Sequence, residues 1–78
     1  MTKGLYTPNY KLFLERLRNA RKQANLTQEQ VSKIINKPQS FVSKSESGER
    51  RIDAMEAAEF ARVYKTSLDH LIKGDEKL

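Results

Sequence analysis

The chain has 78 residues and no cysteine, and its 15 Lys and Arg outnumber its 10 Asp and Glu, which gives a formal charge of +5. This length bounds it to one small domain, and the lack of cysteine excludes disulfides and thiolate metal sites. Helix packing or a partner subunit must therefore supply the stability. No apolar run is long enough to span a bilayer and the N-terminal residues lack the apolar stretch of a signal peptide, so we expect a cytoplasmic protein.

The positive charge is concentrated in the first two-thirds of the chain. Residues 1–51 hold 11 basic and 4 acidic side chains, whereas residues 52–78 hold 4 basic and 6 acidic ones. A basic face on a small domain is typical of proteins that bind a polyanion. Charge alone leaves an ordinary solvated surface as an equal alternative. Membrane binding fits less well, because the basic segments lack a broad apolar face.

The first predicted element is a helix over about residues 10–24. Residues 1–8 contain a Gly and a Pro, show no periodicity and are expected to form a flexible N-terminal arm. Asn9 is a candidate N-cap, and Asn25 is a candidate stop because Asn tolerates left-handed backbone. Apolar residues recur at helical spacing in between, with Lys and Arg on the other face: Phe13, Leu14, Leu17, Ala20 and Ala24.

Two short helices with a break between them are predicted next. Thr27 followed by Gln30 forms a capping box that opens the first of the two. The chain breaks at Asn36-Lys37-Pro38, since Asn can take positive φ and Pro does not suit a helix interior. The second helix starts at the end of this break, at the Pro or the next residue, and stops at Gly48. A single bent helix is the alternative, and the Asn and Pro of the break disfavour it.

The second of these helices has two different sides. At 100° per residue, one arc is polar and can form hydrogen bonds with an outside partner, whereas the other is mostly apolar and should face the core. The polar arc holds Gln39, Ser40, Ser43 and Lys44, the core arc holds Phe41, Val42 and Ser45, and Glu46 lies on the border.

Two more helices complete the predicted all-α fold of five helices. Asp53 is expected to cap a helix that ends near Tyr64, and Ser67 to cap a short one that ends at Gly74. Residues 75–78 form a polar tail. No segment alternates like a strand for more than a few residues. The inward-facing residues are expected to be Ala57, Phe60, Ala61 and Tyr64 in one helix and Leu68, Leu71 and Ile72 in the other.

Two short helices separated by a three-residue break, the second polar on one side, suit helix-turn-helix recognition of DNA. In this motif the first helix crosses the DNA backbone and the second presents its outer face to base edges. Gln is suited to a bidentate contact with adenine, and Ser and Lys reach bases or phosphates. This pattern predicts double-stranded DNA as the partner, read in the major groove.

Several spaced positions resemble one known family. They are Arg21, Leu26-Thr27-Gln28, Gln39-Ser40, Val42-Ser43-Lys44, Glu46, Gly48 and the later segment FARVYKTSLDHLI. The segment Leu26–Asp53 looks like the phage repressor and Cro-like helix-turn-helix family, also called XRE-type regulators, and the broader resemblance covers about residues 12–73. It implies a lambda-repressor-like DNA-binding domain over residues 9–74, with the helix-turn-helix at the second and third helices.

The resemblance also implies roles for individual residues. Arg21 and Glu46 match a partly buried ion pair that fixes the angle of the reading helix rather than adding much net stability. The base-reading set is Gln39, Ser40 and Lys44, with Ser43 beside them on the same arc. The phosphate-binding set is Thr27 and Gln28, at the start of the second helix, and Arg50 and Arg51, after the third.

Less specific interpretations stay open for several of these residues. Gln28 is expected either to contact phosphate or only to cap its helix, and Ser43 either to face DNA or to pack against the turn. Arg50 and Arg51 are either phosphate contacts or ordinary surface charges. Phe41 is expected to be partly exposed rather than fully in the core.

The chain departs from the family pattern where packing is concerned. Ser45 stands where the family has a large apolar residue, so we expect either a void or a satisfied hydroxyl there. Lys65 stands where the family often has Gly, and Asn36 and Lys37 replace a common Gly and a common apolar turn residue. These departures affect packing and turns rather than the DNA-binding roles.

Other functional classes fit the sequence less well. His70 is the one histidine and is expected to be a surface residue, the three glycines are isolated, and no cluster of metal ligands is present, so we expect no enzyme activity, no metal and no cofactor. The serious alternative is an antitoxin-type module that binds a partner protein as well as DNA. Because one short helix reads few base pairs, we expect a homodimeric repressor on a palindromic operator. The expected dimer surface is the C-terminal helix, Leu68 to Ile72.

Overall fold

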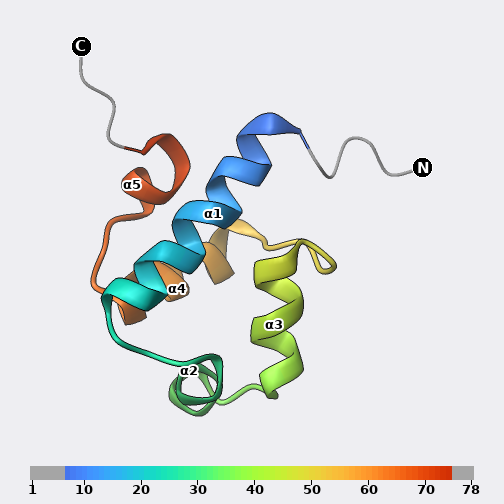
Figure 1. Ribbon diagram of the computed structural model, residues 1–78, viewed down its shortest axis with the longest axis vertical. Coiled ribbons are helices and arrows are strands. Elements are labelled where there is room, and N and C mark those ends of the chain that lie inside the picture. Colours follow the sequence, from blue (N-terminus) through green and yellow to red (C-terminus); the bar gives the residue numbers. More distant parts are fainter. Residues whose placement is uncertain (1–6, 75–78) are drawn as a thin grey trace.

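The path of the chain is set by a series of helices joined by short turns. The computed structural model describes residues 7–74, and over this range the chain forms five helices and no strand. The all-α fold with five helices is therefore confirmed. In chain order the helices are α1 (Pro8–Gln23), α2 (Gln28–Ile35), α3 (Gln39–Ser47), α4 (Ala54–Tyr64) and α5 (Leu68–Lys73) (Figure 1).

Helix α1 begins earlier than the sequence pattern suggested. The Oγ1 atom of Thr7 accepts a hydrogen bond from the backbone N–H of Tyr10 at 3.2 Å, and Pro8 occupies the first helical position. Proline fits there because its missing N–H has no partner in a first turn. The prediction of Asn9 as the cap is therefore wrong, and the expected arm loses its last two residues. The rest of that arm and the expected tail, residues 75–78, lie outside the described residues.

Helices α2, α4 and α5 begin at their predicted caps. Thr27 and Gln30 form the expected capping box, in which the side chain of each accepts a hydrogen bond from the backbone N–H of the other. Asp53 forms a second capping box with Glu56, and the Ser67 hydroxyl caps α5. Each cap satisfies N–H groups that have no partner within the helix, which fixes where the helix begins.

Helix α1 runs through the middle of the fold. It packs against α3, α4 and α5, while α2 packs against α3 and α4 (Figure 1). The apolar side of each helix faces this common centre, as the helical spacing predicted. Ile34 on α2, which the helical spacing places on the apolar side, and Ile72 on α5 are exceptions, because they are 55% and 53% exposed. The fully buried core residues at its centre are Leu17, Val31, Val42, Phe60 and Leu71.

An aromatic row connects α3 to α4. The ring of Phe41 stacks on Phe60 with centroids 6.4 Å apart, and Phe60 stacks on Tyr64 at 5.9 Å. Phe41 is half-buried, as expected, while the other two rings are buried. This row holds the inner side of α3 against the body of the domain, so the opposite side of the same helix faces outward.

Candidate nucleic-acid interface

The turn between α2 and α3 separates the two helices cleanly. Asn36 has a φ of 60°, the left-handed conformation that Asn tolerates better than most residues. The backbone N–H of Lys37 then donates to the Ser32 carbonyl at 2.9 Å, which closes the end of α2. Pro38 is extended, with ψ of 154°, and precedes the first residue of α3. The break therefore lies where the sequence placed it, and the chain forms two helices rather than one bent helix.

Helix α3 turns its polar arc to the solvent. Gln39, Ser40 and Lys44 are exposed, and Ser43 is half-buried. On the opposite side, Val42 is fully buried. Gly48 ends the helix with a φ of 86°, a conformation that only glycine adopts without strain. The four side chains expected to read bases thus share the outer side of one short helix.

A buried carboxylate holds the inner side of this helix. Glu46 is 2% exposed, and Arg21 on α1 reaches it with two hydrogen bonds, from Nε to Oε2 at 2.7 Å and from Nη2 to Oε1 at 3.2 Å. The third nitrogen of the same guanidinium, Nη1, donates to the Leu26 carbonyl at 3.0 Å. The structure therefore contains the expected ion pair, and it joins α1, the start of α2 and α3. The contact with Glu46 raises the pKa of the Arg21 side chain, which stays charged.

Gln28 contributes to the same cluster. Its Nε2 donates to Glu46 Oε1 at 2.9 Å, so its amide group is turned inward from the first position of α2. The sequence pattern predicts that this residue either contacts a phosphate or caps its helix. The structure instead gives its side-chain amide a partner within the protein, and the capping role belongs to Thr27.

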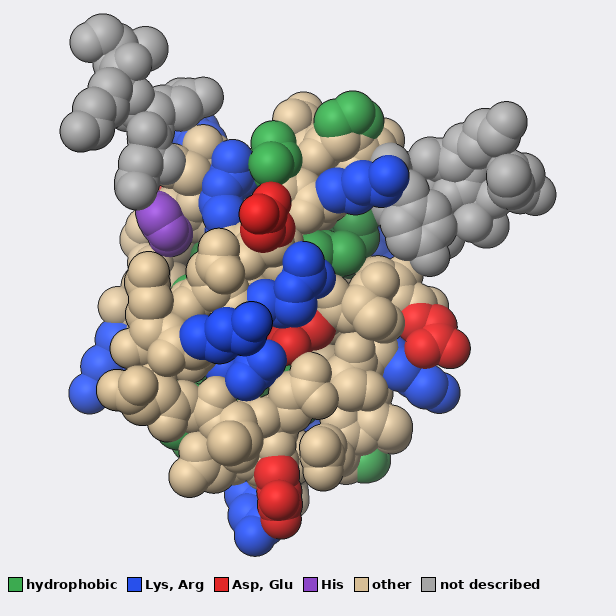
Figure 2. Space-filling model, in the orientation of Figure 1, with side chains coloured by type: hydrophobic (Ala, Val, Ile, Leu, Met, Phe, Trp, Pro, Cys, Tyr) green, Lys and Arg blue, Asp and Glu red, His purple; other side chains and the backbone are tan. Residues whose placement is uncertain are grey.

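Arg18 is a contact that sequence reasoning missed. Its Nη1 donates to the main-chain carbonyl of Glu46 at 2.8 Å. The signal was present, because Arg18 precedes Arg21 by three residues and lies on the same side of α1. Lys and Arg side chains gather over α1 on the face of the molecule that α1 and α3 share (Figure 2). Positive charge therefore lies directly beside the candidate reading helix.

Arg50, one of the expected phosphate contacts, is held within the protein. Its Nη1 and Nη2 donate to Glu56 Oε1 and Oε2 at 3.0 and 2.5 Å, and its guanidinium carbon lies 4.1 Å from the centroid of the Phe41 ring. Nη1 also donates to the Ser45 hydroxyl at 3.3 Å. Of the two outcomes expected at Ser45, the structure has the satisfied hydroxyl. The pair raises the pKa of Arg50 and lowers that of Glu56, mainly through their mutual hydrogen bonds.

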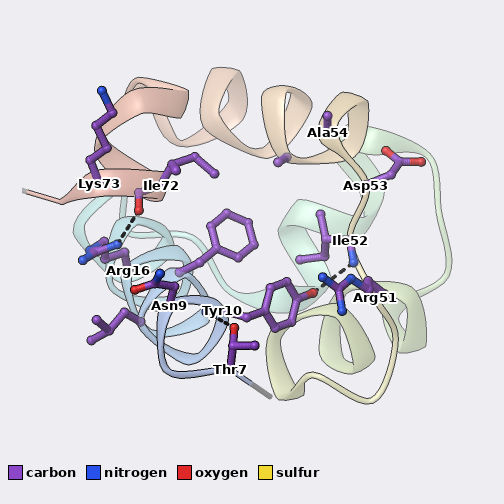
Figure 3. A pocket seen from close by; sticks show the side chains of 13 residues that line it. Thr7, Asn9, Tyr10, Arg16, Arg51, Ile52, Asp53, Ala54, Ile72 and Lys73 are labelled. Atoms are coloured by element: carbon purple, nitrogen blue, oxygen red, sulfur yellow. Dashed lines mark hydrogen bonds between the residues drawn. The ribbon is translucent and has the colours of Figure 1, made fainter. Parts of the chain in front are cut away.

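Arg51 takes a different position in the same loop. Its side chain is exposed, and its guanidinium carbon lies 4.8 Å from the centroid of the Tyr10 ring (Figure 3). The Tyr10 hydroxyl accepts a hydrogen bond from the backbone N–H of Ile52 at 3.0 Å, which pins the loop to α1. Of the two neighbouring arginines, Arg51 is thus the one whose charge is available to an outside anion.

The polar outer side of α3, the preceding α2 and the turn between them define the class of protein: a helix-turn-helix domain. A family model described as helix-turn-helix matches residues 17–71, which is most of the chain. The chain therefore belongs to the XRE-type helix-turn-helix family of DNA-binding transcription regulators, as the resemblance predicted. No curated protein matches the chain. Within residues 7–74, no helix has both the length and the apolar character needed to cross a membrane.

Proposed function

We propose that this protein is a sequence-specific repressor that inserts α3 into the major groove of a palindromic operator and binds it as a homodimer. The observation that carries the proposal is the contrast between the two sides of α3. Its outer side is polar and exposed at Gln39, Ser40 and Lys44, and its inner side is held by the buried Glu46. A rigidly held polar helix is what direct readout of base edges requires. A protein with this function must be in the compartment that contains the DNA.

Base contacts and phosphate contacts fall to different residues in this proposal. Gln39, Ser40, Ser43 and Lys44 face base edges. The exposed hydroxyl of Thr27 and the N-terminal N–H groups of α2 face the phosphate backbone, together with the exposed Arg51. Gln28 remains near this backbone but acts mainly by holding Glu46.

The homodimer is proposed from the apolar surface that α1 and α5 leave exposed. Leu12 is 44% and Ile72 53% exposed, and both line a hollow of about 710 Å³ that α1 and α5 form with the loop before α4 and the start of α4 (Figure 3). Apolar side chains that cluster at a hollow are typical of interfaces between proteins. A second copy would double the number of base pairs read, which a single short helix needs for specificity.

The same hollow supports a second candidate function, binding of a partner protein in the manner of an antitoxin. In that case the hollow would bind a different protein, and the domain would still bind DNA. Size measurements on the purified protein separate the two ideas, because a homodimer forms without any partner. A gel shift, combined with co-purification from cells, then reports whether DNA and a second protein are bound together.

Selection from a random duplex library, followed by affinity measurements at 150 mM salt, tests the proposal directly. We expect tight binding to a selected palindromic sequence and much weaker binding to an unrelated duplex of equal length.

Gln39→Ala should lower discrimination at one base position by about 1–3 kcal/mol. Arg51→Ala should instead weaken binding to all sequences and flatten the salt dependence by about one unit. Equal affinity of the wild type for both duplexes would overturn the proposal.

A further inference from the structure

Ser45 and Glu46 are neighbours on the inner side of α3, and each accepts a hydrogen bond from a different arginine. Arg21 reaches Glu46 from α1, and Arg50 reaches Ser45 from the loop that follows α3. Ser45 is fully buried, and a serine side chain is too small to fill the space of a large apolar residue. The guanidinium of Arg50 and the ring of Phe41 lie against each other beside it.

Arg50 connects three parts of the site through one guanidinium group. It bonds Ser45, stacks on Phe41 of the same helix, and forms a two-pronged pair with Glu56 on α4. Its backbone N–H also donates to the Lys44 carbonyl at 3.1 Å, at the end of α3. Side chain and main chain of this one residue therefore both hold the C-terminal half of the reading helix.

Glu56 is itself fixed from the other side. Its Oε1 accepts a hydrogen bond from the backbone N–H of Asp53 at 3.1 Å, in the capping box of α4. The carboxylate therefore cannot turn away without losing its hydrogen bond in this capping box. A bidentate pair of this kind fixes both position and plane of the guanidinium, which a single hydrogen bond does not. The pair also neutralises the positive charge of Arg50, which would otherwise attract a DNA phosphate.

We infer that Arg50, paired with Glu56, is a positioning residue that sets the orientation of the reading helix by acting on Ser45 and Phe41, and is not a phosphate contact. The inference rests on the proposed function, since it assigns a specificity role within the same site. Lysine cannot replace arginine in this role, because an ammonium group offers neither the two-pronged geometry nor a flat face for the Phe41 ring.

The test is a set of charge-matched variants whose DNA affinity is measured between 50 and 200 mM salt. The probes are a duplex selected by the wild type from a random library and an unrelated duplex of the same length. Glu56→Gln keeps an acceptor for Asp53 but removes the charge that holds Arg50. Glu59→Gln, one turn further along α4, removes the same charge without touching Arg50 and serves as the control. All measurements are made at a temperature at which circular dichroism shows each variant to be folded.

If Arg50 positions the reading helix, disrupting its pair with Glu56 should lower the specificity of DNA binding. Glu56→Gln should weaken binding to the selected duplex by roughly tenfold, with little change for the unrelated duplex and an unchanged salt slope. Arg50→Lys, which keeps the charge, should show the same selective loss. Glu59→Gln should leave affinity unchanged or raise it slightly for both duplexes, because it removes a negative charge from a protein that binds a polyanion.

A phosphate role for Arg50 predicts the opposite sign. Glu56→Gln would then free the guanidinium, raise affinity for both duplexes and steepen the salt slope by about one unit, and Arg50→Lys would stay near wild type. Either result overturns the inference, and so does a loss of stability with unchanged DNA binding. If the wild type itself fails to distinguish the two duplexes, the proposed function fails instead, which is a separate outcome.

Discussion

Lys65 follows the last turn of α4 with a φ of 59°, in the left-handed region. The backbone N–H of Thr66 then donates to the Ala61 carbonyl at 2.9 Å, so the helix ends in the hydrogen bonding that usually accompanies a glycine. The departure from the family's Gly therefore leaves the left-handed ending in place. It makes a lysine adopt a conformation that costs an L-residue about 1 kcal/mol.

Lys65→Gly should stabilise the protein by about 0.5–1 kcal/mol, because the gain from removing the Cβ exceeds the added entropy of the unfolded chain. The free energy of unfolding in urea measures the change. Lys11→Gly is the matched control, since Lys11 is exposed in the right-handed backbone of α1. That change should destabilise by about 1 kcal/mol. Equal effects of the two substitutions would contradict the argument.

The hydroxyl of Tyr64 is the second unusual feature of a single residue. Its side chain is buried, and its hydroxyl has no hydrogen-bond partner among the described residues. Burial, with a further contribution from the charge of Glu46, raises the pKa of this hydroxyl well above its ordinary value, while Arg21 acts in the opposite direction. The folded protein therefore keeps this phenol protonated at pH values at which an unfolded chain releases the proton.

The sign of the resulting pH dependence follows from that difference. Because the folded-state pKa lies above the unfolded one, stability is complete below about pH 10 and falls as the pH rises further, by at most ~1.4 kcal/mol per unit for this group. Tyr64→Phe should remove this part of the decline and should also stabilise the protein by about 1 kcal/mol near neutral pH, since it deletes an unsatisfied hydroxyl. Urea unfolding at pH 7 and above pH 10 measures both effects. A steeper alkaline decline in the variant would refute the assignment.

At the scale of elements, the site is a helix held at its inner side by polar groups. Glu46 accepts hydrogen bonds from Arg21 and Gln28, and its carbonyl accepts one from Arg18. These donors come from α1 and α2, so the carboxylate joins three helices. A buried ion pair of this kind adds little net stability compared with an apolar replacement, but breaking one side of it is costly.

Arg21→Ala should therefore destabilise the protein by about 3–5 kcal/mol, because it leaves a buried carboxylate without its main partner. The double variant Arg21→Met with Glu46→Leu should recover most of that loss, since no charge stays buried. Urea unfolding measures both, and DNA affinity of the double variant adds a second readout. We expect it to fold yet to discriminate poorly between duplexes, because α3 then lacks its directional contacts. A double variant as unstable as the single one would show that the pair is not the cause.

At the scale of the whole molecule, the reading helix and the hollow proposed for the second copy lie on different elements, and they come nearest at Arg51, the proposed phosphate contact, which also lines the hollow. The outer side of α3 carries the polar arc, while Leu12 on α1 and Ile72 on α5 border the hollow proposed for the second copy. This arrangement would allow two copies to pair without covering the reading helices, as the proposed binding to a palindrome requires.

If the protein is the proposed homodimer, Ile72→Lys should convert it to a monomer, because the substitution places a charge in an apolar interface. Sedimentation equilibrium at micromolar concentration measures the change, and affinity for the selected operator should fall with it. Ile34→Lys on α2 is the matched control, since Ile34 is 55% exposed, close to the value for Ile72. It should leave the mass unchanged. A wild type that sediments as a monomer at these concentrations would remove the basis for the dimer.

The sequence by itself determined the local features of this protein. Capping residues, the left-handed Asn36, Gly48 and the helical spacing of apolar residues act over a few positions, so the helices and the break between α2 and α3 could be predicted without coordinates. The early start of α1 was missed because Thr7 and Asn9 are both good caps, and only the fit of the proline between them decides. The family model supplied independent support for the class.

Only the tertiary structure decided which polar side chains point outward and which are held within the protein. Arg50 and Arg51 are adjacent and chemically identical in the sequence, yet one is paired with Glu56 and the other is exposed. Gln28 likewise turns to a carboxylate that lies 18 positions away. Such pairings depend on how α1, α3 and α4 cross, because a guanidinium or amide binds whichever acceptor the packed helices bring within about 3 Å.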